Sequence, residues 1–295
     1  MRAADYTEKG LTSARVNEDV PISPTLGKTA PLARRNNFDA LRFWAAIAVL
    51  WSHAFPLSGT NAREPITVIT NGQESAGSIA VVVFFVMSGY LIALSYDRGR
   101  NPLIFIWSRA LRILPGLIVV LSLLALVAGP LLTVNSLKEY LLDFRPFKYI
   151  ILNLPVFLAA RDELPGVFLN NPFPRAVDGS LWTLAYEVRC YALILVLGLA
   201  GLLNKRVVLS LYIVCVVAAA FLSSSDYHFV SQNLRFAAPF LAGSCLFLWK
   251  VEANPVFVCA AVVALVGAVF VPGLLWLALA SAGAYLVIGL LNQRR

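Results

Sequence analysis

The stretch Asn37–Leu57 reads NFDALRFWAAIAVLWSHAFPL, an apolar run of membrane-spanning length that nevertheless contains Asp39, Arg42 and His53. Arg42 and His53 are 11 residues apart in the sequence. That is about three turns of an α-helix and predicts one shared helix face, with about 16 Å between the two residues. An arginine and a histidine inside a membrane segment are costly unless they face protein or water. The stretch therefore predicts a transmembrane helix with a functional face.

The composition of the whole chain fits a membrane setting. Of its 295 residues, 59% are hydrophobic and only 14% are charged, and the mean hydropathy is +0.75. An ordinary soluble domain has roughly 45–50% apolar and about 25% charged residues. Apolar runs of about 17–23 residues alternate with short segments that carry charges, Pro or Gly. The sequence predicts an all-α fold, a polytopic helical membrane protein surrounded by membrane lipid.

We expect about eight transmembrane helices, with both termini in the cytoplasm. Residues 1–36 are polar and broken by prolines, which predicts a disordered cytoplasmic tail before a membrane domain at 37–295. Most Lys and Arg lie in segments that this topology leaves in the cytoplasm. The long segment 133–180 holds a short apolar stretch, 149–160, expected to lie at the interface or to re-enter the membrane. The expected spans are 38–57, 77–96, 113–132, 181–203, 207–223, 233–249, 255–271 and 273–291.

The net charge of +8 does not indicate a nucleic-acid-binding protein, because the basic residues flank the apolar runs, as the positive-inside rule predicts. The cysteines do not indicate a disulfide or metal site either. They lie inside apolar runs with no CxxC motif and no neighbouring histidine, and predict small buried side chains; they are Cys190, Cys215, Cys245 and Cys259. We therefore expect no metal.

His53 is the candidate general base, because imidazole is the side chain best suited to accept a proton near neutral pH. The structural alternative is an interfacial histidine near a helix end, beside Trp51 and Phe55. Arg42 keeps its charge and could hold a carboxylate, a phosphate or a developing oxyanion. Its structural alternative is an ion pair with Asp39, three residues earlier.

Arg109 and Arg112 form an RxxR pair in a basic connector, 97–112, that also carries Arg98 and Arg100. Anchoring at the cytoplasmic membrane surface would explain them. The functional interpretation is a phosphate clamp, since guanidinium groups bind phosphate oxygens in pairs.

A third stretch, GSLWTLAYEVR at 179–189, brings Glu187 and Arg189 about two turns into an apolar run. Glu187 shares a helix face with Thr183 and Ser180, whereas Arg189 points elsewhere. A glutamate at that depth predicts either a functional group or half of a buried ion pair.

Together these stretches resemble the acyltransferase 3 family of integral membrane acyltransferases, which includes bacterial O-antigen, exopolysaccharide and nodulation-factor acetylases. Five motifs carry the resemblance, in the family's order over about residues 37–250. They are FDALRFWAAIAVLWSH with its R-x10-H spacing, FFVMSGYLI, SRALRILP with its RxxR, GSLWTLAYEVRCY and RFAAPFLAGSCLFL.

The resemblance implies transfer of an acyl group from cytoplasmic acyl-CoA to a sugar hydroxyl on the far side of the membrane. It implies that His53 is the catalytic base, supported by Arg42, and that Glu187 lines the active-site core. Arg109 and Arg112 would hold the CoA phosphates, and we assign Ser88 and Tyr90 to the same co-substrate, with no tightly bound cofactor. We expect direct transfer without a covalent enzyme intermediate, because the sequence places no certain nucleophile beside His53.

The resemblance also implies about ten helices and, near the end, a segment of the kind SYxxYLxH. The expected spans number eight and the segment is absent, so we expect the chain to be short at its C-terminus. The resulting hypothesis is that the chain is an acetyl-CoA-dependent O-acyltransferase of the bacterial inner membrane. Its acceptor would be an extracytoplasmic or lipid-linked carbohydrate. The alternatives are a glycan or small-molecule transporter, and a truncated, inactive relative that acts as a partner.

Overall fold

The computed structural model describes residues 32–155, 163–222 and 228–292, and these residues form helices and connecting turns. The described part contains no named strand, only an isolated antiparallel bridge between Thr133 and Val167. The prediction of an all-α membrane fold is confirmed. The expected disordered tail lies almost entirely outside the described residues, as does the second half of the apolar stretch 149–160.

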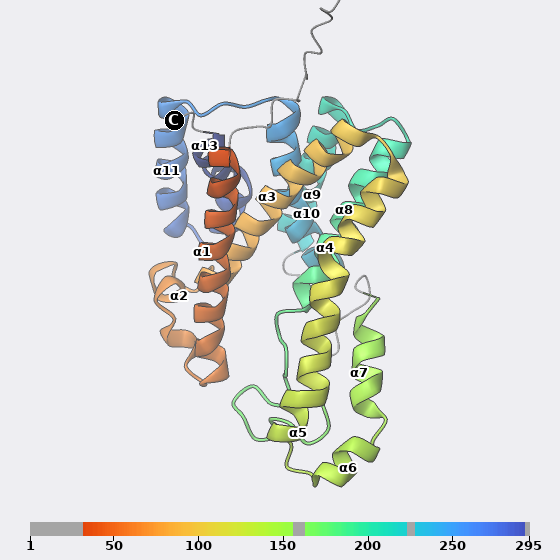
Figure 1. Ribbon diagram of the computed structural model, residues 1–295. Helices are drawn as coiled ribbons and strands as arrows, with labels where there is room; N and C mark the ends of the chain where they lie inside the picture. Colours follow the sequence, from red (N-terminus) through yellow and green to blue (C-terminus); the bar gives the residue numbers. More distant parts are fainter. Residues whose placement is uncertain (1–31, 156–162, 223–227, 293–295) are drawn as a thin grey trace, which may run out of the picture.

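The helices follow one another with short connections (Figure 1). The first half of the chain contains α1 (Leu32–Leu57), the 3-10 turn η1 (Asn61–Arg63), α2 (Pro65–Ile69), α3 (Ala76–Gly99), α4 (Pro102–Leu123), the π-helical turn η2 (Leu124–Ala128), α5 (Gly129–Leu132), α6 (Leu137–Leu142) and α7 (Arg145–Asn153). The second half contains α8 (Trp182–Leu199), α9 (Lys205–Leu222), α10 (His228–Leu248), α11 (Pro255–Val269), α12 (Leu274–Ala278), the π-helical turn η3 (Leu279–Gly283) and α13 (Ala284–Asn292).

Within the described ranges, 6 helical segments are long and apolar enough to cross a membrane. They are Asn37–Leu57, Ala76–Gly99, Pro102–Leu132, Trp182–Leu199, Lys205–Leu222 and Leu274–Leu291. These correspond to six of the eight expected spans. The other two are α10, which has 21 residues but carries Asn233 and Arg235 in its first half, and α11, which has only 15 residues.

The basic connector expected at 97–112 is not a connector. Helix α3 continues to Gly99, and α4 begins at Pro102, so Arg109 and Arg112 belong to α4 itself. The reason is local: the Asn101 side chain accepts hydrogen bonds from the backbone N–H groups of Leu103 and Ile104, and Pro102 suits the first helical position. The third span therefore starts 11 residues earlier than expected at 113.

Helix α3 is the centre of the bundle and runs obliquely between α1 and α8 (Figure 1). Its closest partner is α10, and glycines make that approach possible. A Cβ atom on Gly89 would lie 1.8 Å from the Phe240 carbonyl oxygen, and one on Gly243 would lie 2.1 Å from the Val86 oxygen. The Ser244 hydroxyl donates to the Gly89 carbonyl at 3.0 Å. The motifs around Gly89 and Gly243 thus form one tight helix crossing, as small residues do in membrane proteins.

Glu64 holds together the starts of two helices. Its carboxylate accepts hydrogen bonds from the backbone N–H groups of Thr67 in α2 and of Ala76, the first residue of α3, at 2.5 and 3.0 Å. The residue is 1% exposed. Burial alone would raise the pKa of Glu64, but the hydrogen bonds to its charged form outweigh that effect and hold the pKa below its ordinary value.

Replacing Glu64 by alanine is expected to lower the free energy of unfolding by about 1–3 kcal/mol near neutral pH, because two buried amides lose their acceptor. A carboxyl whose pKa is depressed by folding stabilises the protein above its unfolded-state pKa of about 4.3, and that contribution disappears as the pH falls through the folded-state pKa. Thermal unfolding in detergent should therefore show a gap between wild type and Glu64→Ala that narrows below about pH 4. Glu163→Ala is the control, because its ion pair with Arg175 is exposed. A difference in unfolding temperature that stays constant with pH would contradict the interpretation that ionised Glu64 caps the two helices.

Candidate active site

A cavity of about 440 Å³ lies among α1, α3, α4 and α8 and collects most of the predicted site residues. Arg42 reaches it from α1, Ser88 from α3, Arg112 from α4 and Glu187 from α8. Tyr191, Asp178 and Ser180 complete its polar lining; its apolar walls are Phe84, Ile113, Gly116, Leu117, Val120, Leu181 and Leu184. Residues about 145 positions apart in the sequence therefore meet at one site.

Glu187 is the centre of a half-buried hydrogen-bond cluster in this cavity. Its Oε1 accepts hydrogen bonds from the Ser88 hydroxyl, at 3.0 Å, and from the Tyr191 hydroxyl. The two hydroxyl oxygens are themselves 3.3 Å apart. Glu187 and Tyr191 are four residues apart on α8 and share a face, and the α3–α8 contact adds Ser88. The cluster fixes the position of a half-buried carboxylate in the cavity wall.

Two guanidinium groups face the same cavity. Arg42 pairs with Asp39 at 3.7 Å, but Asp39 is 71% exposed, so this pair is weak. Arg112 makes no hydrogen bond or ion pair with any residue that the structure describes. The Asp178 carboxylate at the rim is engaged by the backbone N–H and hydroxyl groups of Ser180. The cavity therefore presents positive charge available to an anionic ligand.

The structure separates the RxxR pair. Arg112 lines the cavity, whereas Arg109, one turn earlier on α4, does not. Arg109 donates to the hydroxyls of Ser95 and Ser108 at 3.4 and 3.3 Å and lies over the Phe105 ring. The cavity thus combines Arg112 with Arg42 rather than with Arg109. Binding of CoA phosphates by Arg109 stays a prediction from the sequence.

His53 lies on α1, beyond Arg42 toward the helix end at Leu57, and does not line this cavity. Its Nδ1 is 2.8 Å from the Val49 carbonyl oxygen. A carbonyl oxygen can only accept, so Nδ1 carries the hydrogen and Nε2 of the neutral ring has a free lone pair. Trp51 and Phe55 form an edge-to-face pair on the same helix. The geometry leaves His53 able to accept a proton through Nε2.

Tyr90 lies apart from the cavity. Its ring packs against Phe38 of α1 and Phe247 of α10, with centroid distances of 6.1 and 5.6 Å. These contacts give Tyr90 a packing role between three helices. Its assignment to the co-substrate stays a prediction.

Tyr191 is a site residue that sequence reasoning did not single out. The signal was present, since Tyr191 follows Glu187 by four residues and so shares its helix face. Arg189, on a different face of α8, donates to the Asn233 side chain at 3.1 Å and lies between the rings of Tyr186 and Phe229. Arg189 thus joins α8 to α10.

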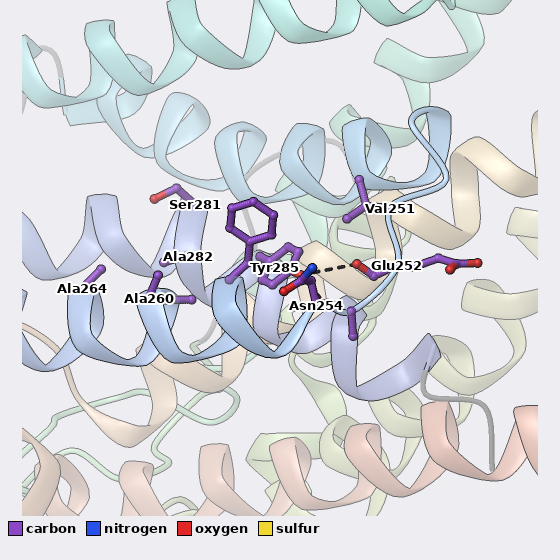
Figure 2. A pocket seen from close by; sticks show the side chains of 11 residues that line it. Val251, Glu252, Asn254, Ala260, Ala264, Ser281, Ala282 and Tyr285 are labelled. Atoms are coloured by element: carbon purple, nitrogen blue, oxygen red, sulfur yellow. Dashed lines mark hydrogen bonds between the residues drawn. The ribbon is translucent and has the colours of Figure 1, made fainter.

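A larger cavity of about 790 Å³ lies between α11 and α13 (Figure 2). Alanines form much of its wall, and none of the predicted site residues lines it. The Tyr285 hydroxyl accepts from the Asn254 backbone N–H and donates to the Glu252 carbonyl, which fastens the loop before α11. The part of the chain that the structure describes contains no cluster of three or more His, Cys, Asp or Glu side chains able to hold a metal. The smaller cavity is therefore the candidate active site.

Comparison with known proteins gives three findings. A family model described as an acyltransferase domain matches residues 35–293. The O-acetyl transferase of Shigella phage Sf6 is 34% identical over 209 residues, which cover 70% of this chain and 57% of that protein. Nodulation protein 10 of Rhizobium leguminosarum bv. viciae is 35% identical over 169 residues, 53% of this chain and 42% of that protein. The chain spans about half the length of these curated relatives. No solved structure matches it significantly.

Proposed function

The chain belongs to the acyltransferase 3 family, and on that premise we propose that it is a membrane O-acyltransferase. The enzyme transfers an acyl group, in the first place acetyl, from cytoplasmic acyl-CoA to a carbohydrate hydroxyl. The acceptor is extracytoplasmic or lipid-linked, and the membrane is the inner membrane of a bacterium. The name of the phage relative, an O-acetyl transferase, supports the acetyl group.

The observation that carries the proposal is the cavity that brings two arginines to the half-buried carboxylate of Glu187. Acyl-CoA is polyanionic, and its phosphates suit Arg42 and Arg112. Glu187, fixed by Ser88 and Tyr191, balances part of the positive charge and orients the polar wall. The long, flexible pantetheine arm would then carry the thioester along α1 toward His53.

The chemical step follows from the state of His53. Its Nε2 lone pair accepts the proton of the sugar hydroxyl as that oxygen attacks the thioester carbonyl carbon. A C–O bond forms, the C–S bond breaks, and the departing CoA sulfur takes the proton that the His53 imidazolium releases. In the proposed topology the N-terminus is cytoplasmic, which puts Arg42 on the CoA side and His53 nearer the acceptor.

The direct test uses the full chain in nanodiscs with isotope-labelled acetyl-CoA, together with mass spectrometry of surface polysaccharides from cells that have or lack the gene. An acyltransferase turns over the thioester, and cells that carry the gene add acetyl groups to a glycan. A transporter or an inactive partner would give neither result.

Arg112→Gln is expected to weaken acyl-CoA binding by about 10- to 100-fold, since a charge-assisted contact to phosphate is worth about 1.5–3 kcal/mol. Arg109→Gln, the same change three residues away on α4, should have a smaller effect, because Arg109 is occupied by Ser95 and Ser108. Isothermal titration with acetyl-CoA measures both. Equal losses would instead favour a clamp made by the whole RxxR pair, and no loss from Arg112→Gln would remove the phosphate role.

A further inference from the structure

A second polar cavity, of about 410 Å³, opens at the end of the bundle where α3 begins. Gln73 and Glu74 precede α3, Arg235 comes from α10 and Trp276 from α12. Its remaining lining residues are Ala219, Ala220, Val271, Pro272, Gly273, Leu274 and Leu277. None of these residues belongs to the candidate active site.

The polar groups of this cavity are held in fixed positions. The Arg235 Nη2 donates to Glu74 Oε1 at 2.9 Å, and the Glu74 side chain is only 5% exposed. The guanidinium lies 5.4 Å from the centre of the Trp276 ring. Gln73 connects the segment before α3 to α11 and α12. Its side-chain amide donates to the Val269 carbonyl at 2.8 Å and accepts from the Leu275 backbone N–H at 3.3 Å.

A purely structural role explains this arrangement poorly. Burying an ion pair gains little over well-packed apolar side chains, because desolvation offsets the attraction. The pair lies at the end of the bundle, just before α3, where a water-soluble ligand can reach it. Here the pair also remains accessible, since the Arg235 side chain is 34% exposed and borders open volume.

The charges indicate the class of ligand. Arg235 is ion-paired with Glu74 at 2.9 Å, so this cavity offers an anion no unpaired guanidinium, whereas the candidate active site offers Arg112. It offers an indole, guanidinium donors and a carboxylate acceptor. A neutral sugar has both an apolar ring face and hydroxyls that donate and accept, and it matches such a mixed lining.

The cavity also lies at the level of the proposed base. Gly77 of α3 packs against Ser52, which precedes His53 on α1, and a Cβ on Gly77 would come within 3.0 Å of the Ser52 hydroxyl oxygen. Glu74 lies three residues before Gly77. We propose that the cavity of Glu74, Arg235 and Trp276 is a carbohydrate subsite that holds a neutral, non-reacting sugar of the acceptor. The proposal rests on the proposed function, since it assumes a glycan acceptor.

The experiment measures saturation-transfer NMR of the full chain in nanodiscs with methyl glycosides of glucose, rhamnose and N-acetylglucosamine. Trp276→Ala should weaken glycoside binding by roughly tenfold or more, as truncation of a central aromatic contact does. Trp249→Ala is the matched control, because Trp249 forms a similar cation–π pair with Lys205 outside this cavity. Arg235→Lys keeps the ion pair with Glu74 but loses the planar fork, and it should also weaken binding. Phosphate should not compete.

The outcomes separate this site from the proposed function. Acetyl-CoA binding and slow thioester hydrolysis, measured on the same samples, should be unchanged in both variants. Wild-type protein that binds none of the glycosides, or that binds them equally well after Trp276→Ala, overturns the subsite. If Trp276→Ala does not fold, wild-type binding by Arg235→Lys overturns it. If the wild type binds glycosides and Trp276→Ala does not, but the wild type never binds acetyl-CoA, the subsite is supported and the acyltransferase proposal is refuted.

Discussion

His53→Ala is expected to lower the rate of acyl transfer by about 10²- to 10⁴-fold, the usual contribution of a general base, while acyl-CoA binding stays within about twofold. The first expectation follows from the free Nε2 lone pair, which the Val49 contact at Nδ1 guarantees in the neutral ring. The second follows from geometry, since the guanidinium groups lie in a cavity that His53 does not line. Transfer from labelled acetyl-CoA and titration of acetyl-CoA measure the two quantities separately.

Two further variants sharpen the test of His53. His53→Gln keeps a donor that can reach the Val49 carbonyl but has no basic nitrogen, so it should be as inactive as His53→Ala. Leu50→Ala is the control on the same helix, because Leu50 is 73% exposed to the surroundings of the bundle. It should transfer at nearly the wild-type rate. Transfer by His53→Ala at the wild-type rate would refute the proposed mechanism.

The outline of the fold could be predicted from the sequence because membrane spans are visible as apolar runs. The functional face of α1 was also visible, since Arg42 and His53 interrupt such a run at helical spacing. The ends of the helices were harder to predict from the sequence. The charges of 97–112 suggested a connector, but Asn101 and Pro102 begin a helix there, and its arginines face a cavity or the Ser95 hydroxyl.

Membership of the cavity could be predicted only in part. Arg109 and Arg112 look equivalent in sequence, yet residues three apart on a helix differ by about 60° in direction. The packing of α4 against α3 turns one toward the cavity and the other toward Ser95. Whether Arg112 and Arg42 line the same cavity depends on how the helices pack, and no local sequence pattern predicts that. The same contact brings Ser88 to Glu187 across 99 residues.

The sequence SGY at 88–90 shows how adjacent residues can serve different ends. Ser88 donates to Glu187 in the cavity, Tyr90 packs between aromatic rings, and Gly89 lies against the backbone of α10. A motif that resembles one functional unit thus divides into a polar contact, a packing contact and a close helix crossing. The glycine sets the distance between α3 and α10, the helix whose Phe247 packs against Tyr90.

Gly89→Ala is expected to destabilise the protein by about 3 kcal/mol or more, a large effect for one added methyl group. Its Cβ would lie 1.8 Å from the Phe240 carbonyl oxygen, a backbone atom that cannot rotate away. The two helices must separate, and the Ser244 hydrogen bond to the Gly89 carbonyl is then lost. Thermal unfolding in detergent, with size-exclusion chromatography to detect aggregation, measures the effect.

Gly267→Ala is the matched control, with an expected change of opposite sign. Gly267 lies inside α11 and a Cβ there would meet nothing within 4 Å. Alanine should stabilise that helix by about 0.5–1 kcal/mol. Gly243→Ala, whose Cβ would meet the Val86 oxygen at 2.1 Å, should behave like Gly89→Ala. If Gly89→Ala is as stable as Gly267→Ala, the crossing is not tight. If it folds but transfers no acyl group, the crossing of α3 and α10 supports the active site as well as the bundle.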